Sequence, residues 1–363
     1  MRKTLTLLAL LLALCLPLSC KGGDQGEQGG PSQGQSGEIT VVFVPKITGN
    51  AFFESANKGA QEYAARHGFK VDYRGSPEAS VPDQVAVVEQ AIKDKVPAIS
   101  ISSLDRTALD DVLKKALDAG IVVTTWDSDV SGDARRIMVS QGTPSQLGRM
   151  LVEMGAKSLT KRGKNPSTDP IKYAWHYSQA SVADQNSWRE AGEEYIKSAF
   201  PNWENVKPDN YYSEQDPEKA LSVGKEILTE HPDIDLIICN DSTSLPGQAQ
   251  ALKDMGKDAE DVSVTGFASP NAMKEFCREG IIDRWGLWDC QIQGAMACYI
   301  SYYLASGNQL NVGQMVDIPE IGMLEVMPNT VLDPNMGTAP DSGVVLLPQR
   351  TEFTLDNMDD YDF

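Results

Sequence analysis

Short apolar runs alternate with amphipathic stretches along the chain from Glu38 onward. Runs rich in Val and Ile are typical of strands that are buried on both faces of a parallel sheet. The amphipathic stretches between them are typical of helices that cover such a sheet. The first strands are predicted at Ile39–Val44, Phe69–Tyr73, Ala98–Ser102, Ile121–Trp126 and Ile137–Val139. The helices between them are predicted at Phe52–Arg66, Val81–Lys95 and Thr107–Ala119.

The same alternation starts again after a polar loop at Lys161–Pro170. It predicts strands at Ile171–Tyr177, Val206–Tyr212, Ile234–Cys239, Val262–Gly266 and Asp283–Leu287. The accompanying helices are predicted at Ser145–Ser158, Asn186–Ala199, Pro217–Glu230, Ser244–Met255 and Asn271–Arg278, and a further helix at Gln291–Ser306 is expected to return to the first lobe. The fold class is therefore α/β, with two doubly wound parallel-sheet lobes joined by a multi-strand hinge.

We expect the chain to cross between the lobes three times, near Gln141–Pro144, Trp288–Gln291 and Met323–Pro328. The N-terminal lobe then comprises residues 39–142 and 289–324, and the C-terminal lobe comprises residues 143–288 and 325–363. Two such lobes enclose a cleft, which is where small ligands usually bind. Because the crossings act as hinges, the expected motion is closure of the lobes around a ligand.

Residues 1–20 are typical of an export signal rather than of a folded segment. Arg2 and Lys3 precede an apolar segment that ends at Leu18, which is shorter than the roughly 20 residues that a membrane-spanning helix requires. Small residues before Cys20 resemble the bacterial lipobox, in which the cysteine becomes the lipidated first residue after cleavage. An ordinary secretory signal cleaved near Ser19 is the alternative. We expect a lipoprotein in the periplasm or at the cell surface, attached to a membrane only through Cys20.

The composition narrows the classes of partner. Residues 21–38, rich in Gly, Gln, Ser and Pro, are typical of a flexible linker between an anchor and a globular body. The formal net charge of −19 argues against nucleic acid as a partner and against direct binding of the body to anionic lipid. We expect a monomer that binds a small neutral ligand.

Four cysteines lie beyond the leader, at Cys239, Cys277, Cys290 and Cys298. They form no Cys-x-x-Cys motif and have no histidine at metal-ligand spacing, so we expect no metal site. Buried thiols are the favoured interpretation, and a Cys277–Cys290 disulfide is the alternative.

Polar residues follow several predicted strands at their carboxyl ends, where the ligands of parallel sheets bind. In the first lobe these are Lys46 after the first strand and Asp127 and Asp129 after the fourth. Lysine donates hydrogen bonds to ligand oxygens, and carboxylates accept strong ones from hydroxyl groups. We expect Asp127 to bind the ligand and Asp129 to hold the turn, with Phe52 and Phe53 packed on the apolar face of the ligand.

The second lobe offers Asp184 and Gln185 after its first strand, although Asp184 can also cap the helix that follows. Trp288 and Asp289 lie at the second predicted crossing. An indole ring there can stack on a ligand, and the carboxylate can bind it.

The signature motifs of several enzyme classes are missing from the sequence, which has no P-loop, no G-x-S-x-G, no H-E-x-x-H and no G-x-G-x-x-G. Its histidines, His67, His176 and His231, are scattered, and surface or structural roles are favoured for them. Two aspartates form the acid pair of many glycosidases, but nothing else in the sequence supports bond cleavage. We therefore expect a binding protein without a cofactor rather than an enzyme.

Several segments together resemble the type I periplasmic solute-binding proteins. They are Val44-Pro45-Lys46, Trp126-Asp127-Ser128-Asp129, Gln141-Gly142-Thr143-Pro144, Asp184-Gln185-Asn186 and Leu287-Trp288-Asp289. Within that family they are most similar to the autoinducer-2-binding proteins of the Lsr system, with rhamnose- and ribose-binding proteins as neighbours. The resemblance extends from Ile39 to Phe363 and rests on the order and spacing of the segments.

The resemblance implies five ligand contacts, which are Lys46, Asp127, Asp184, Gln185 and Pro246. Gln248, two residues past the proline, stands where the family has a small residue, and we expect its amide to contact the ligand or to narrow the pocket. The lipobox is a second difference, because the enteric members of the group are free in the periplasm.

We therefore expect the substrate-binding lipoprotein of an ABC importer. It would capture a small sugar or the sugar-like signal autoinducer 2 and deliver it to an ABC permease. The alternatives are a rhamnose- or ribose-type sugar binder and a ligand sensor that presents its closed form to a chemoreceptor or a sensor kinase.

Overall fold

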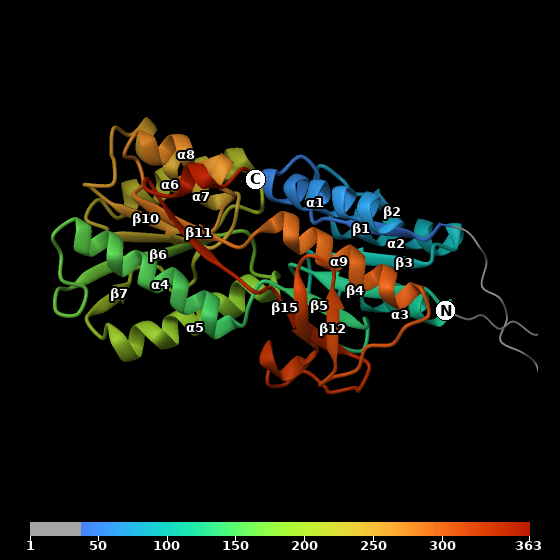
Figure 1. The fold of residues 1–363 in the computed structure, drawn as a ribbon. Helices are drawn as coiled ribbons and strands as arrows, with labels where there is room; N and C mark the ends of the chain where they lie inside the picture. The colour runs from blue at the N-terminus through green and yellow to red at the C-terminus, as the bar shows by residue number, and fades with distance from the viewer. Residues whose placement is uncertain (1–37) are drawn as a thin grey trace, which may run out of the picture. The chain divides into compact units, whose positions relative to one another are not determined.

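Residues 38–363, the part of the chain that the computed structural model describes, fold into two α/β lobes (Figure 1). Both lobes follow the alternation of strands and helices that the sequence predicts, so the expected fold class is confirmed. The expectations for residues 1–37, which include the export signal and lipidation at Cys20, fall outside the described residues.

The first lobe is built on a seven-stranded sheet in the order β14-β15-β5-β4-β3-β1-β2, parallel except between β14 and β15. Helices α1 and α9 pack on one face of this sheet, and α2 and α3 pack on the other. This double cover explains why Val and Ile fill both faces of the central strands. The elements are β1 (Thr40–Val44), α1 (Ala51–His67), β2 (Lys70–Tyr73), α2 (Val81–Asp94), β3 (Ala98–Ile101), α3 (Asp110–Asp118), β4 (Val122–Trp126), β5 (Ile137–Ser140), α9 (Cys290–Ala305), β12 (Met315–Ile318), β13 (Gly322–Glu325), β14 (Met327–Pro328), η1 (Asn329–Val331) and β15 (Gly343–Leu346).

The second lobe contains a parallel sheet in the order β10-β9-β6-β7, with β8 beside the end of β6. Helices α4 and α5 lie on one face of it, and α6 and α7 lie on the other (Figure 1). The elements are α4 (Pro144–Lys161), β6 (Ile171–Tyr177), α5 (Ala183–Ala199), β7 (Trp203–Asn205), β8 (Tyr211–Tyr212), α6 (Pro217–Glu230), β9 (Leu236–Cys239), α7 (Ser244–Asp254), β10 (Ser263–Gly266), α8 (Pro270–Arg278), β11 (Arg284–Leu287), β16 (Thr351–Thr354) and η2 (Met358–Asp360).

The third crossing between the lobes lies later in the chain than the sequence suggests. Strand β15 pairs with β5, and β14 pairs with β15, so residues 325–346 belong to the first lobe and not to the second. The physical reason is that β5 would otherwise expose an open edge, which the fully buried Val344 and Val345 now cover. Only β16 returns to the second lobe, where it pairs with β11.

The single strand predicted at Val206–Tyr212 does not form. The chain instead forms two short strands, β7 and β8, with a turn between them. Pro208 has no N–H to donate to a strand ladder, and Asn210 adopts a left-handed φ of +61°. The turn brings β8 beside the carboxyl end of β6, next to the cleft.

Two glycines allow α1 and α9 to pack closely. A Cβ atom at Gly294 would lie 2.0 Å from the carbonyl oxygen of Ala56, and one at Gly59 would lie 2.2 Å from that of Gln291. No larger residue fits at such a distance. The contact places the start of α9, and with it the second crossing, directly beside α1.

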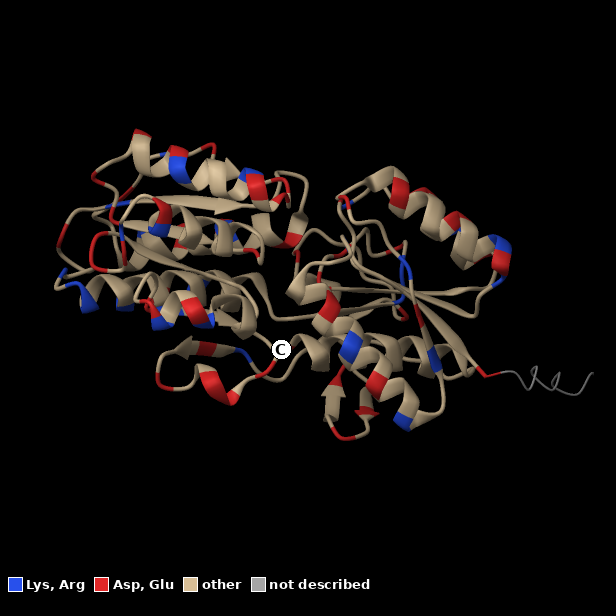
Figure 2. Ribbon diagram, turned by 90° about the horizontal axis from the view of Figure 1, so that it is seen from above, with Lys and Arg blue, Asp and Glu red and all other residues tan. Residues whose placement is uncertain are grey.

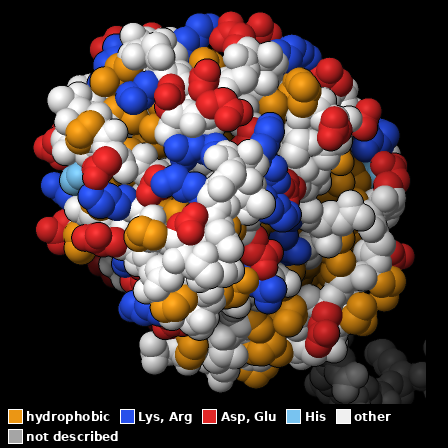
Figure 3. Space-filling model, turned by 90° about the vertical axis from the view of Figure 1, so that its left-hand side faces the viewer, with side chains coloured by type: hydrophobic (Ala, Val, Ile, Leu, Met, Phe, Trp, Pro, Cys, Tyr) orange, Lys and Arg blue, Asp and Glu red, His pale blue; other side chains and the backbone are white. Residues whose placement is uncertain are grey.

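The charged residues and the cysteines of residues 38–363 are distributed as follows. Acidic and basic residues are spread over both lobes (Figure 2), and they lie intermixed on the face shown in Figure 3. The four cysteines of residues 38–363 are buried free thiols, as favoured from the sequence. No helix in this range is both long and apolar enough to cross a membrane.

Candidate ligand-binding site

A cavity of about 390 Å³, including its mouth, lies between the lobes at the carboxyl ends of their strands. Side chains from both lobes and from the second crossing line it, so an occupant would touch both lobes at once. The lining residues are Lys46, Asn50, Phe52, Phe53, Asp127, Gln185, Trp188, Gln215, Asn240, Asp241, Ser242, Thr243, Phe267 and Trp288.

A buried ion pair forms the polar end of this cavity. Lys46 Nζ lies 3.0 Å from Asp127 Oδ2, and the two residues are only 3% and 5% exposed. Ser102 Oγ donates to the same carboxylate oxygen at 2.7 Å. Asp127 follows β4 directly and has a left-handed φ of +59°, a conformation that Asp and Asn adopt more readily than most residues. The ion pair therefore joins the ends of β1 and β4, the two strands that flank β3 in the first sheet.

The loop that carries Lys46 is tied to the sheet by one side chain. Gln84 Nε2, from α2, donates to the carbonyl oxygen of Pro45 at 3.0 Å and to that of Ser102 at 2.7 Å. Its Oε1 accepts from the backbone N–H of Leu104 at 3.0 Å. This amide joins the loops after β1 and β3 and keeps Lys46 at the floor of the cleft.

Carboxyl groups from both lobes surround Lys46. Burial disfavours its ammonium form, but Asp127, Asp184 and Asp241 outweigh that effect and raise the pKa of Lys46 above its usual value. Burial raises the pKa of Asp184 to about 6, although Lys46 acts in the opposite direction. Burial also raises the pKa of Asp241. In the described part of the chain, no group of three or more His, Cys, Asp or Glu side chains is arranged to hold a metal ion.

Aromatic rings form the apolar wall of the cavity. The ring of Trp288 meets those of Phe52, Trp188 and Phe267 edge to face, at centroid distances of 5.8, 5.9 and 5.5 Å. Its Nε1 donates to Gln293 Oε1 at 2.6 Å, so the indole N–H is satisfied within the protein. The wall therefore offers apolar ring surface, which suits the C–H face of a small cyclic molecule.

The loop after β9 adds two polar residues, Asn240 and Asp241, that were not among the contacts predicted from the sequence. Asn240 Nδ2 donates to the carbonyl oxygen of Gln185 at 2.9 Å, while its buried Oδ1 has no partner among residues 38–363. Asp241 accepts from the backbone N–H groups of Thr243 and Ser244 at 2.8 and 3.1 Å. The sequence does contain a signal for these residues. They directly follow the buried strand β9, and ligands of parallel sheets bind at the carboxyl ends of the strands.

Six of the predicted contacts line the cavity, namely Lys46, Phe52, Phe53, Asp127, Gln185 and Trp288. The other four, Asp184, Pro246, Gln248 and Asp289, do not. Pro246 lies in the first turn of α7 and Asp289 caps α9 by accepting from the N–H of Ile292 at 3.0 Å. Gln248 is buried beneath α6, where it donates to the carbonyl oxygen of Gly224 at 3.3 Å and contacts His176 Nδ1 at 3.1 Å. It therefore neither reaches the cavity nor narrows it.

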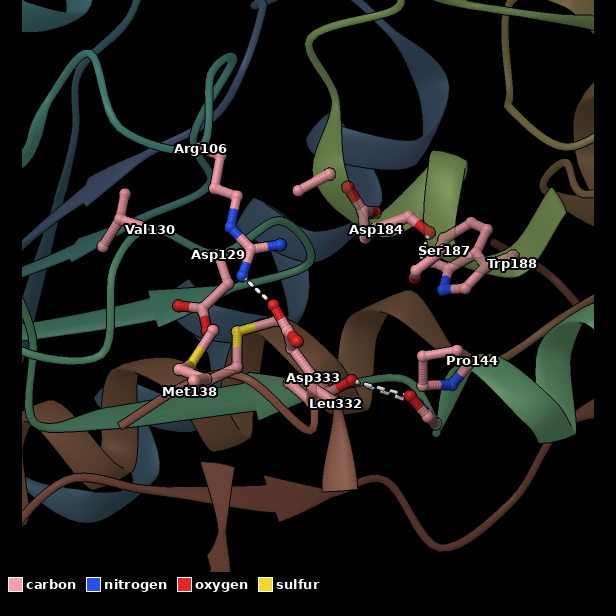
Figure 4. A pocket seen from close by; sticks show the side chains of 14 residues that line it. Arg106, Asp129, Val130, Met138, Pro144, Asp184, Ser187, Trp188, Leu332 and Asp333 are labelled. Carbon is pink, nitrogen blue, oxygen red and sulfur yellow. Dashed lines mark hydrogen bonds and ion pairs between the residues drawn. The ribbon is translucent and has the colours of Figure 1, made fainter. Parts of the chain in front are cut away.

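Asp184 lines a second cavity, of about 450 Å³ including its mouth, that shares Trp188 with the first (Figure 4). Its Oδ1 accepts from Ser128 Oγ at 2.5 Å, across the cleft, and its buried Oδ2 has no partner within residues 38–363. An ion pair between Arg106 and Asp333 borders the same cavity. Asp184 therefore lies beside the first cavity, and its Oδ2 is available to accept a hydrogen bond.

Asp129 has a different role from its neighbour Asp127. Its carboxylate receives two hydrogen bonds from the buried guanidinium of Arg135, at 2.9 and 2.6 Å, and one from Thr125 Oγ1 at 2.5 Å. The carboxylate of Asp129 therefore holds the turn, as predicted from the sequence.

Hydrogen bonds across the cleft show that the lobes are closed in this structure. Besides the bond from Ser128 to Asp184, Asn50 Nδ2 donates to Thr243 Oγ1 at 3.4 Å. Asn50 also caps α1 by accepting from the N–H of Phe52 at 3.0 Å. Asn50 therefore fixes the start of α1, which carries Phe52 and Phe53 of the aromatic wall, and also makes one contact between the lobes.

Comparisons with known proteins agree with this architecture. LsrB from Clostridium saccharobutylicum, solved in complex with AI-2, is 62% identical, over 90% of this chain and 100% of that chain, with a TM-score of 0.89. An ABC transporter solute-binding protein from Clostridium phytofermentas with bound L-rhamnose is 20% identical, over 90% of this chain and 99% of its own, with a TM-score of 0.79. That second likeness shows the fold alone.

A curated relative and a family model complete the comparison. The D-ribose/D-allose-binding protein of Pseudomonas aeruginosa is 28% identical over 285 residues, which is 76% of this chain and 82% of the relative. The model of the periplasmic binding protein domain matches residues 41–309. The resemblance drawn from the strand-end motifs is thereby confirmed, and the chain belongs to the periplasmic binding protein family.

Proposed function

We propose that this protein captures autoinducer 2 or a small sugar between its lobes. The observation that carries the proposal is the buried cluster of Lys46, Asp127 and Asp184 beside an aromatic wall. Charged donors and acceptors bind the hydroxyl groups of a polyol strongly, and the rings suit its apolar face. The likeness to LsrB supports autoinducer 2 as the first candidate, and the ribose and allose relative supports a sugar as the second.

Five of the residues that line the cavity, together with Asp184 beside it, then each have a task in binding the ligand. Lys46 donates to a ligand oxygen, while Asp127 and the free oxygen of Asp184 accept from hydroxyl groups. Phe52, Phe53 and Trp288 pack against the carbon face of the ligand. Because these groups come from both lobes, the ligand binds the closed form better than the open form and shifts the population toward it.

We also propose that the closed form delivers its ligand to an ABC permease from a lipid-anchored position. Transport fits the family, whose solved relatives include solute-binding proteins of ABC transporters. The anchor rests on Leu18-Ser19-Cys20 and on the flexible composition of residues 21–38. One lipid-modified terminus supplies the membrane affinity that an acidic body lacks.

The first prediction concerns ligand identity. In a thermal-shift screen with autoinducer 2, ribose, allose and rhamnose, at least one compound should raise the melting temperature. A ligand present at 100 times its dissociation constant adds about 2.7 kcal/mol to the free energy of unfolding. If none of the four changes the melting temperature, the proposed ligand class is wrong.

The Asp127→Asn variant tests the polar end of the cavity. Asparagine tolerates the left-handed φ at this position and has nearly the same volume, so the loop should stay folded. Loss of the charged acceptor should weaken binding by about 10- to 100-fold, measured by calorimetry. An unchanged affinity in the folded variant would remove Asp127 from the site.

The pH dependence of stability tests the position of Asp184. Burial raises the pKa of Asp184 to about 6, so in the range between its unfolded pKa near 4 and pH 6 the folded protein holds this proton more tightly. Ionisation of Asp184 therefore removes stability as the pH rises through that range. In urea unfolding without ligand, Asp184→Asn should be about 3 kcal/mol more stable than the wild type at pH 7. The difference should shrink toward pH 4.

Asp129→Asn is the contrasting variant for the same titration series. It leaves the buried Arg135 without its charged partner and should therefore lower the free energy of unfolding at pH 7. If Asp184→Asn also lowers it at pH 7, the carboxylate of Asp184 is stabilised in the fold, and the account of its burial is wrong.

Lipidation at Cys20 can be tested on the mature protein. Mass spectrometry of the mature protein from its native membrane should find Cys20 as the first residue, carrying a thioether-linked lipid. Cys20→Ser should release the protein in soluble form without changing its affinity for ligand. A mature chain that begins elsewhere and carries no lipid would rule out the anchor.

A further inference from the structure

Gln215 lines both the proposed ligand cavity and an open groove between the lobes. It lines the cavity together with Lys46 and Asp127. It also lines a wide groove of about 1390 Å³, counted to its open side, that is bordered by residues 77–79, 179–181 and 212–219. Residues 77–79 belong to the first lobe, and residues 179–181 and 212–219 belong to the second. Gln215 is therefore the residue that the linings of the cavity and of the groove share.

The amide of Gln215 is buried with an unused donor. The residue is only 8% exposed, and its Nε2 has no hydrogen-bond partner among residues 38–363. A buried N–H group without a partner costs free energy, and such groups are rare in folded proteins. An oxygen atom of a molecule in the cavity would provide the missing acceptor.

The backbone holds Gln215 in a conformation that costs energy. Glu214 and Gln215 have φ angles of +54° and +58°, in the left-handed region that disfavours residues with a Cβ atom. Consecutive left-handed residues other than Gly or Asn persist only where the surrounding structure imposes them, and they concentrate at functional sites.

The surrounding structure does impose this conformation. The backbone N–H groups of Ser213 and Glu214 donate to the carbonyl oxygens of Tyr177 and Ser178, at the end of β6, at 2.8 and 2.7 Å. On the other side, Asp216 caps α6 by accepting from the N–H groups of Glu218 and Lys219 at 2.8 and 2.9 Å. Gln215 lies between these two sets of hydrogen bonds and therefore has little freedom to turn away from the cavity.

We propose that Gln215 is a specificity-determining residue whose amide donates a hydrogen bond to an oxygen on the groove-facing end of the ligand. This inference rests on the proposed function and adds to it the chemistry of the ligand. The ligand carries oxygen atoms at both ends, one set held by Lys46 and Asp127 and another by Gln215. An analogue that lacks the groove-facing oxygen leaves Nε2 unpaired, and the site discriminates against it.

The test is calorimetric titration with autoinducer 2, or with the sugar that shifts the melting temperature if autoinducer 2 does not. Gln215→Leu keeps the approximate size of the side chain and removes the donor, so it should bind about 10- to 100-fold more weakly than the wild type. Among single-deoxy analogues of the ligand, one should bind the wild type and Gln215→Leu with equal affinity, because it lacks the oxygen that Gln215 contacts.

Gln215→Gly separates the ligand contact from a role in holding the loop. Glycine adopts a positive φ at no steric cost, so the ligand-free variant should melt at the same temperature as the wild type or higher, while its affinity falls as in Gln215→Leu. The matched control is Gln179→Leu, the same change in the outer groove at a residue that does not line the cavity. It should bind with wild-type affinity.

The outcomes are distinguishable. If Gln215→Leu binds the ligand as the wild type does, this inference is overturned while the proposed function stands. If Gln215→Gly instead lowers the melting temperature of the ligand-free protein, Gln215 serves the loop, and the inference is again overturned. If the wild type binds none of the tested compounds, the proposed function falls and this inference falls with it.

Discussion

The buried ammonium group of Lys46 is the constraint on which the site depends. A lone charge cannot be taken out of water without a large cost, so the fold must supply carboxylates around it. Asp127 lies in the same lobe at 3.0 Å, but Asp184 and Asp241 act on Lys46 from the opposite lobe. The charge of Lys46 is thus best compensated when the lobes are closed. A ligand with hydroxyl groups can bridge the same groups and strengthen that closed arrangement.

The rest of the first lobe holds this cluster in place. Asp129 anchors the turn beside Asp127 through Arg135, whose guanidinium also donates to Asn329 Oδ1 at 2.9 Å and to the carbonyl oxygen of Gly343 at 3.1 Å. These last two residues belong to the segment around β14 and β15 that joins the first sheet. Because the chain crosses to the second lobe only after β15, Asn329 and Gly343 stay in the first lobe and complete the hydrogen-bond network of Arg135 and Asp129 behind Asp127.

The sequence predicts most of the fold, because runs such as Ile121–Trp126 and Leu236–Cys239 carry the β-branched pattern of buried parallel strands. It also predicts Lys46, Asp127 and Gln185 in the cavity, because strand ends converge at one edge of a sheet. Gln248 could not be placed, since its position depends on which face of α7 turns toward α6. Gln215 could not be found either, because a left-handed φ in a Glu-Gln pair leaves no signature in the sequence.

We expect the charge of Lys46 to draw the two lobes together around a ligand. Small-angle X-ray scattering of the wild type and of Lys46→Met, with and without saturating ligand, tests it directly. Methionine keeps the length and apolar stem of lysine but leaves three carboxyl groups without their cation. The account predicts that the wild type contracts on binding, whereas Lys46→Met has the radius of gyration of an open form and does not contract. A Lys46→Met protein that closes to the same radius as the ligand-bound wild type would contradict the account.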